Sequence, residues 1–96
     1  MDEPHYNYGM KALEIADKLI DFELSSDEAF EQLGALMDSK ALLPETEYGD
    51  EFHFSNSGIE SNVLYLHSEI LYLRIGDSDL DSIMEKRNAL AQCLGE

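Results

Sequence analysis

Apolar residues recur at three- and four-residue steps in several stretches of the chain, which is the spacing of one face of an α-helix. The first stretch runs from about Tyr8 to Glu23 and carries Lys, Asp and Glu between its apolar positions. This pattern predicts an amphipathic helix over residues 8–23. Its expected buried residues are Leu13, Ile15, Ala16, Leu19, Ile20 and Phe22.

A second helix is predicted to begin at Ser25. Ser25 and Glu28 have the spacing of a capping box, in which each side chain accepts a hydrogen bond from the other residue's backbone N–H. Asp27 and Glu28 also oppose the positive end of the helix dipole. The helix should end near Asp38, because Pro44 prevents continuation soon afterwards.

The third helix is predicted over residues 58–75. Its apolar residues step by four, three, four and three, which is the seam of a packed helix. They are Ile59, Val63, Leu66, Ile70 and Leu73. Ser57 and Glu60 have the spacing of a second capping box, and Gly76 provides a stop.

The fourth helix should begin with Ser78 as its N-cap and end at Gly95. Its expected buried residues are Leu80, Ile83, Met84, Leu90, Ala91 and Leu94. We therefore predict a single all-α domain over residues 1–96, an antiparallel four-helix bundle with a long acidic connection between its second and third helices. The residues expected to be buried together are Leu13, Ile20, Phe30, Leu33, Val63, Leu66, Ile70, Ile83 and Leu90.

The long connection, residues 39–57, holds a short helix around residues 45–54 or stays irregular. Tyr48, Phe52 and Phe54 alternate there with acidic residues. Aromatic anchors ringed by charge are typical of electrostatically steered interfaces, although Phe52 and Phe54 could instead tuck the segment onto the bundle. The candidate partner-binding residues are Glu45, Glu47, Tyr48, Asp50, Glu51 and His53, aided by Asp21, Glu23 and Asp27 near the first interhelical turn.

Charge narrows the possible partners. The chain has 21 Asp and Glu against 6 Lys and Arg, a net charge of −15, and no basic residue lies between Lys18 and Lys40 or between Lys40 and Arg74. Binding nucleic acid through its phosphates needs clustered basic residues, so that function is excluded. The charge favours a basic protein partner, with a surface selected only for solubility as the alternative.

Catalytic and metal-binding motifs are missing from the sequence. Asp77, Asp79 and Asp81 resemble the start of a calcium loop, but Ser82 and Asn88 stand where that loop needs Gly and Glu, so a helix-cap role is the better interpretation. His5, His53 and His67 lack metal-ligand spacing. We expect no enzyme activity, no metal and no cofactor.

The cysteine content and the absence of targeting signals indicate the cellular compartment. Cys93 is the single cysteine and cannot form an internal disulfide, which suits a reducing compartment. The acidic N-terminus lacks the features of a signal peptide, and no stretch is apolar enough to span a membrane. We expect a complete, soluble, cytoplasmic protein that is a monomer or a weak dimer.

The stretch from Ala12 to Phe30, ALEIADKLIDFELSSDEAF, resembles the opening helix–turn–helix of immunity proteins related to that of colicin D. These include partners of tRNA-cleaving toxins from contact-dependent inhibition systems. The resemblance covers about a fifth of the chain and consists of an apolar pattern. It implies a helical bundle whose acidic face covers the catalytic cleft of a toxin, with no catalytic residues of its own.

The main functional hypothesis is therefore an immunity protein that blocks the basic active site of a nuclease toxin. The runner-up is a phage or plasmid DNA mimic that blocks a restriction or CRISPR effector, which should array its carboxylates along an extended face. A third class, an adaptor for an apolar partner, should show an exposed hydrophobic stripe. We expect the four helices to use their apolar residues in the core.

Overall fold

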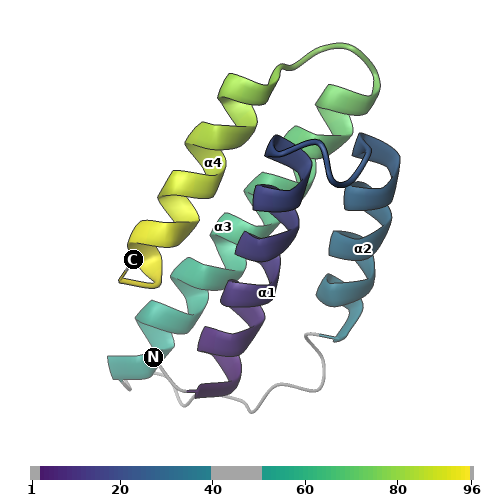
Figure 1. The fold of residues 1–96 in the computed structure, drawn as a ribbon. Helices are drawn as coiled ribbons and strands as arrows, with labels where there is room; N and C mark the ends of the chain where they lie inside the picture. The colour runs from purple at the N-terminus through teal and green to yellow at the C-terminus, as the bar shows by residue number, and fades with distance from the viewer. Residues whose placement is uncertain (1–2, 40–50, 96) are drawn as a thin grey trace.

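The computed structural model describes residues 3–39 and 51–95, and side chains from residue 57 onward in the second range. Four α-helices make up the regular structure of the described residues, so the all-helical prediction is confirmed. They are α1 (Glu3–Ile20), α2 (Ser26–Asp38), α3 (Glu51–Arg74) and α4 (Leu80–Cys93) (Figure 1).

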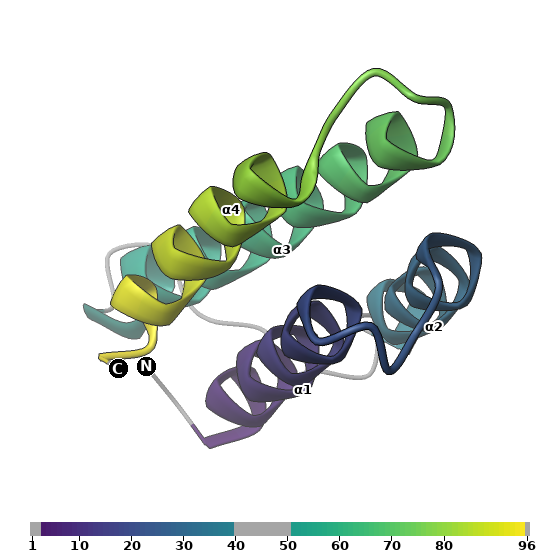
Figure 2. The ribbon, with the colours of Figure 1, turned by 45° about the horizontal axis from the view of Figure 1, so that its top comes forward.

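The helices form two layers, with α1 and α2 in one and α3 and α4 in the other (Figure 2). Both α1 and α3 pack against each of the other three helices. The connection between α1 and α2 and the connection between α3 and α4 stand at the same end of the molecule, at the top of Figure 1. Topology therefore brings two connections that are distant in sequence to one end.

The core confirms most of the predicted seam. Ile59, Val63, Leu66 and Ile70 of α3 are fully buried, as are Leu33, Ile83 and Leu90 from the other helices. On α1, the small residues Ala12 and Ala16 are also fully buried. Of the residues expected at the centre, Ile20 and Phe30 are only partly buried and pack against the edge of this cluster.

The capping box predicted for α2 is confirmed. The Ser25 hydroxyl accepts a hydrogen bond from the Glu28 backbone N–H at 3.1 Å, and a Glu28 carboxylate oxygen accepts one from the Ser25 N–H at 3.2 Å. Two of the N–H groups that a helix start leaves free are satisfied in this way. The helix ends at Asp38, as the sequence predicts.

Three predicted helix boundaries are wrong. The first helix starts at Glu3 rather than Tyr8 and ends at Ile20 rather than Glu23. The third starts at Glu51, so Ser57 and Glu60 lie inside it and form no second capping box. Polar residues are compatible with a helix interior, so their spacing alone did not mark a start.

The N-cap of α4 is Asp79, not Ser78. An Asp79 carboxylate oxygen accepts a hydrogen bond from the Ser82 backbone N–H at 2.9 Å, whereas the Ser78 hydroxyl donates to Glu69 on α3. Both side chains can cap a helix, and the tertiary contact to Glu69 takes Ser78 away from that role.

The expectation that all four helices bury their apolar residues in the core is also wrong. Met84 on α4 is 40% exposed rather than buried, and α3 carries exposed apolar side chains opposite its seam. These are Leu64, Tyr65, Leu71 and Tyr72, and the exposed Ile75 follows directly after the end of the helix. In the described part of the chain, no helix combines the length and the apolar character needed to cross a membrane.

Candidate protein-binding site

The connection after α1 closes with a residue in an unusual conformation. The Glu23 N–H donates to the Lys18 carbonyl at 2.8 Å, and the Phe22 N–H donates to the Leu19 carbonyl at 3.2 Å. This is the Schellman arrangement, which needs a left-handed residue just past the helix end. Phe22 occupies that position with φ of 62°, and it is the only non-glycine residue with positive φ among those described.

The end of α3 provides an internal comparison. The Asp77 N–H donates to the Tyr72 carbonyl and the Gly76 N–H to the Leu73 carbonyl, which is the same closure. There the left-handed position is held by Gly76, with φ of 85°. Glycine adopts this backbone without steric cost, whereas an L-residue such as Phe22 loses about 1–2 kcal/mol.

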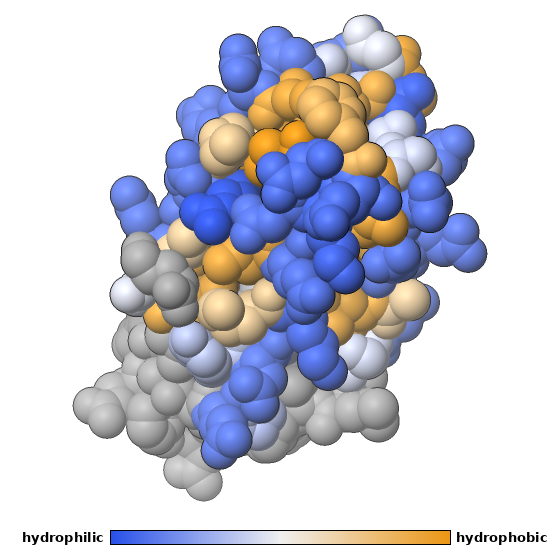
Figure 3. Space-filling view, in the orientation of Figure 1, coloured by the Kyte–Doolittle hydropathy of each residue, from blue (hydrophilic) through white to orange (hydrophobic). Residues whose placement is uncertain are grey.

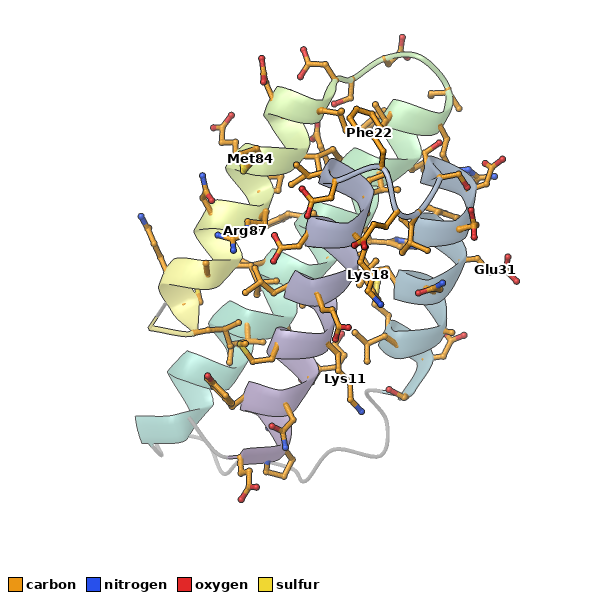
Figure 4. The ribbon with its side chains drawn as sticks, in the orientation of Figure 1. Lys11, Lys18, Phe22, Glu31, Met84 and Arg87 are labelled. Carbon is orange, nitrogen blue, oxygen red and sulfur yellow. The ribbon has the colours of Figure 1, made fainter. Side chains whose placement is uncertain are left out.

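Burial of the Phe22 ring does not offset the steric cost of this backbone, because the residue is 82% exposed. It lies at the top of the molecule in Figure 4, where the space-filling view shows apolar side chains interrupting a polar surface (Figure 3). Its neighbours in sequence, Asp21 and Glu23, are both exposed. The turn thus presents an aromatic ring between two carboxylates.

The second connection adds acidic residues to the same end. Asp77, Asp79 and Asp81 are exposed there, and Ile75 is 61% exposed. The hydrogen bond from the Ser82 N–H holds the pKa of the Asp79 carboxyl below its usual value. Asp79 caps α4 and Asp81 lies in its first turn, whereas the Asp77 N–H closes the end of α3. Among the described residues, no three His, Cys, Asp or Glu side chains form a group that could hold a metal ion.

At this end of the molecule, Arg74 forms an ion pair with Asp27. Its Nε lies 2.7 Å from Asp27 Oδ1, and its guanidinium carbon stands 4.4 Å from the centre of the Phe30 ring. Phe30 in turn stacks on His67, with ring centres 4.3 Å apart. Asp27, which has no basic neighbour in sequence, is therefore partly neutralised in space, whereas no ion pair to Asp21 or Glu23 occurs within the described ranges.

Carboxylates along α1 are compensated in a similar way. Lys18 pairs with Glu14 at 3.3 Å, and Arg87 of α4 pairs with Asp17 at 2.8 Å. These α1 residues, together with Lys11 and Met10, line an open groove of about 590 Å³. Glu23 borders the same groove as Lys11 and Lys18. Because acids and lysines alternate in it, the groove is not a strongly acidic surface, and Asp21 and Glu23 are the acids at its end that form no ion pair among the described residues.

The structure separates the residues proposed from the sequence. Asp21, Glu23 and Asp27 lie at one end, as expected. Glu51 and His53 are in the first turn of α3. Arg74, which bonds Asp27, is at the other end of that helix, about 35 Å away at 1.5 Å per residue. Glu45, Glu47, Tyr48 and Asp50 lie outside the described residues.

The prediction that Phe22 is buried is wrong, because the residue is exposed in the turn after α1. Its spacing from Ile15 and Leu19 fits the buried stripe of α1, which is why the pattern predicts a core position. The available signal was the cap at Ser25, because a helix that must end before a new N-cap leaves little room for residues 21–24. Without a glycine in this turn, the sequence did not show which residue takes the left-handed position.

Away from the acidic end, three polar side chains, those of His5, Tyr8 and His67, are buried or partly buried between the helices. Burial and the nearby Glu60 carboxylate raise the pKa of Tyr8 to about 12, and His5 Nε2 lies 3.5 Å from Glu60. Burial lowers the pKa of His67, whose Nε2 finds no hydrogen-bond partner among the described residues. Tyr8 and Glu60 line a small open pocket of about 180 Å³ together with Ser57, Ser61, Met37 and Leu64.

The comparisons with known proteins are negative. No protein-family model matches the chain, and no match was found among the curated proteins or among the solved structures. The function is therefore argued from the chain itself.

Proposed function

We propose that this protein is an immunity protein that binds and blocks the basic active site of a cognate nuclease toxin, with a tRNA-cleaving ribonuclease as the expected target. The observation that carries the proposal is the Asp21–Phe22–Glu23 turn, where an exposed aromatic ring stands in a strained backbone between two exposed carboxylates that form no ion pair among the described residues. Four helices, in the antiparallel bundle that the sequence predicts, hold this turn in place.

Strain supports a binding role for Phe22. A residue held in the left-handed region lowers stability, and such residues gather at functional sites. Gly76 shows that this chain uses glycine at the equivalent position of another helix. A phenylalanine that stabilises neither the backbone nor the core has a reason to be there if its ring enters a partner.

The acidic residues beside Phe22 support a basic partner. The active site of a ribonuclease must be cationic, because it binds phosphates. Carboxylates at one end of the inhibitor complement it and accelerate association, to about 10⁸ M⁻¹s⁻¹ or more at low salt. Phe22 would then supply contact area at the centre of the interface, where aromatic anchors contribute most to affinity.

The test uses the toxin domain encoded next to this protein. Its tRNA-cleaving activity should fall to background when one equivalent of the protein is added, and cells that produce the domain should survive only when the protein is present. If the neighbouring gene encodes no basic domain, or if cleavage continues at equimolar inhibitor, the proposal is wrong.

Variants locate the contact surface. Reversing Asp21 and Glu23 to Lys should abolish inhibition, whereas reversing Glu31 and Glu85, exposed on α2 and α4, changes the net charge equally and should preserve it. Figure 4 shows Glu31 pointing away from the bundle. Equal losses from both double variants would favour the DNA-mimic alternative, which needs carboxylates over an extended face.

A further inference from the structure

The outer face of α3 is apolar and exposed. The exposed fractions are 49% for Leu64, 56% for Tyr65, 40% for Leu71, 50% for Tyr72 and, directly after the helix end, 61% for Ile75. At 100° per residue, these side chains and the smaller Ser61 and Ser68 share the side of the helix opposite the buried seam. Side chains of these sizes on a surface helix are normally paired with another helix.

No charged residue belongs to this outer face, although the chain carries a net charge of −15. The charged residues of the same stretch lie on the flanks and turn toward neighbouring elements. Glu60 lies near His5, Glu69 accepts a hydrogen bond from Ser78, and Arg74 bonds Asp27. A cationic partner would therefore find a carboxylate only at the edge of this face, where Glu60 lines a small pocket with Ser61 and Leu64.

The order of residues on the face is symmetric about Ser68. Leu64 and Tyr72 lie four residues to either side of it, and Tyr65 and Leu71 lie three residues to either side. A two-fold axis through Ser68 would place each of these side chains opposite a member of the same set in an antiparallel copy. The small serine at the centre would let the two helices approach closely.

We propose that the outer face of α3 binds a second copy of this chain, forming an antiparallel α3–α3 contact with its two-fold axis at Ser68. A two-fold interface between identical subunits must be self-complementary. The outer face of α3 meets this condition in the order of its side chains and in its lack of charge. It is also the surface where two acidic chains can meet without burying carboxylates. The proposal is independent of the nuclease partner, which would bind the end of the bundle.

The area predicts a weak dimer. Aromatic side chains bury roughly 150–250 Å² each, so the exposed halves of Tyr65 and Tyr72 offer on the order of 200 Å² per copy. With the three aliphatic side chains, the contact totals on the order of 1,000 Å² over both copies, near the lower limit for specific interfaces. A weak dimer that dissociates on dilution is expected.

Sedimentation equilibrium of the full chain over a range of concentrations tests the proposal. We expect a monomer–dimer equilibrium that shifts toward dimer as salt increases, because salt screens the repulsion between acidic chains. Leu71→Glu should abolish the dimer, whereas Met84→Glu, equally exposed at 40% but on α4, should leave it unchanged. A wild-type chain that remains monomeric throughout, or equal effects of the two variants, would overturn the proposal.

Cross-linking tests the register. In a Cys93→Ser background, Ser68→Cys should form a disulfide-linked dimer quickly on mild oxidation, because the two-fold axis places the residue against its own copy. Ser61→Cys should not, because the two copies of residue 61 would lie about 21 Å apart along the paired helices. Cross-linking of both at the same rate would contradict the symmetric contact. Loss of toxin binding would leave both results unchanged, so the two proposals fail separately.

Discussion

Replacing Phe22 with glycine should make the protein more stable and a poorer inhibitor. The residue holds a left-handed backbone with φ of 62° and is 82% exposed. Glycine removes the steric cost of that backbone, and loss of an exposed ring removes little core contact. The same change deletes the aromatic group that we expect to enter the partner.

The magnitude follows from two opposing terms. Relief of the left-handed strain contributes about 1–2 kcal/mol. The greater freedom of glycine in the unfolded chain costs about 0.4–1 kcal/mol. The net gain is about 0.5–1 kcal/mol, which for a domain of this size raises Tm by roughly 2–8 °C.

Thermal and urea unfolding of wild type, Phe22→Gly and Phe22→Ala provide the assay. Phe22→Ala keeps the left-handed strain and loses the ring, so its stability should stay close to wild type while both variants lose affinity, mainly through faster dissociation. If Phe22→Gly is destabilised as much as a core truncation, the ring belongs to the fold. If both variants inhibit like wild type, Phe22 is not an anchor.

Three further changes test the packing. Leu66 is fully buried, so Leu66→Ala should lower the free energy of unfolding by about 2–5 kcal/mol, measured in urea. Gly34→Ala should raise the free energy of unfolding by about 0.5–1 kcal/mol, because the added Cβ meets only His67 Nε2 at 3.5 Å. Gly9→Ala should lower the free energy of unfolding, because the added Cβ would lie 2.6 Å from a Leu94 methyl group. The lowered pKa of His67 means that the unfolded chain binds its proton first, so stability should fall as pH drops below 6.5, by at most about 1.4 kcal/mol per pH unit. His67→Gln should flatten that slope just below pH 6.5.

Local chemistry made part of the fold predictable. The Ser25–Glu28 capping box and the α3 seam are defined by residues a few positions apart, and both match the structure. Helix ends were harder, because Phe22 fits the periodicity of α1 and the cap at Ser25 limits the length of the helix without showing which residue takes the left-handed conformation. The start of α3 was missed because Ser57, Gly58 and Glu60 are compatible with both a cap and a helix interior.

The candidate site depended on information that is not local. The sequence identified Asp21, Glu23 and Asp27 as acids without basic neighbours, but the pairing of Asp27 with Arg74 joins residues 47 positions apart. The meeting of the two short connections at one end follows from topology (Figure 1). Similarly, α3 is apolar on two sides, and periodicity could not tell which side the other helices leave exposed.

The most direct test of the central claim is the association rate of the protein with its toxin domain, measured by stopped flow at several salt concentrations. Asp21→Lys with Glu23→Lys should slow association at least tenfold at low salt and reduce its salt dependence, and Glu31→Lys with Glu85→Lys should have a much smaller effect. Reversal of Glu47, Asp50 and Glu51 in the same assay tests whether that segment also contacts the partner. An association rate that is unchanged by the Asp21 and Glu23 reversals would contradict binding through the acidic end.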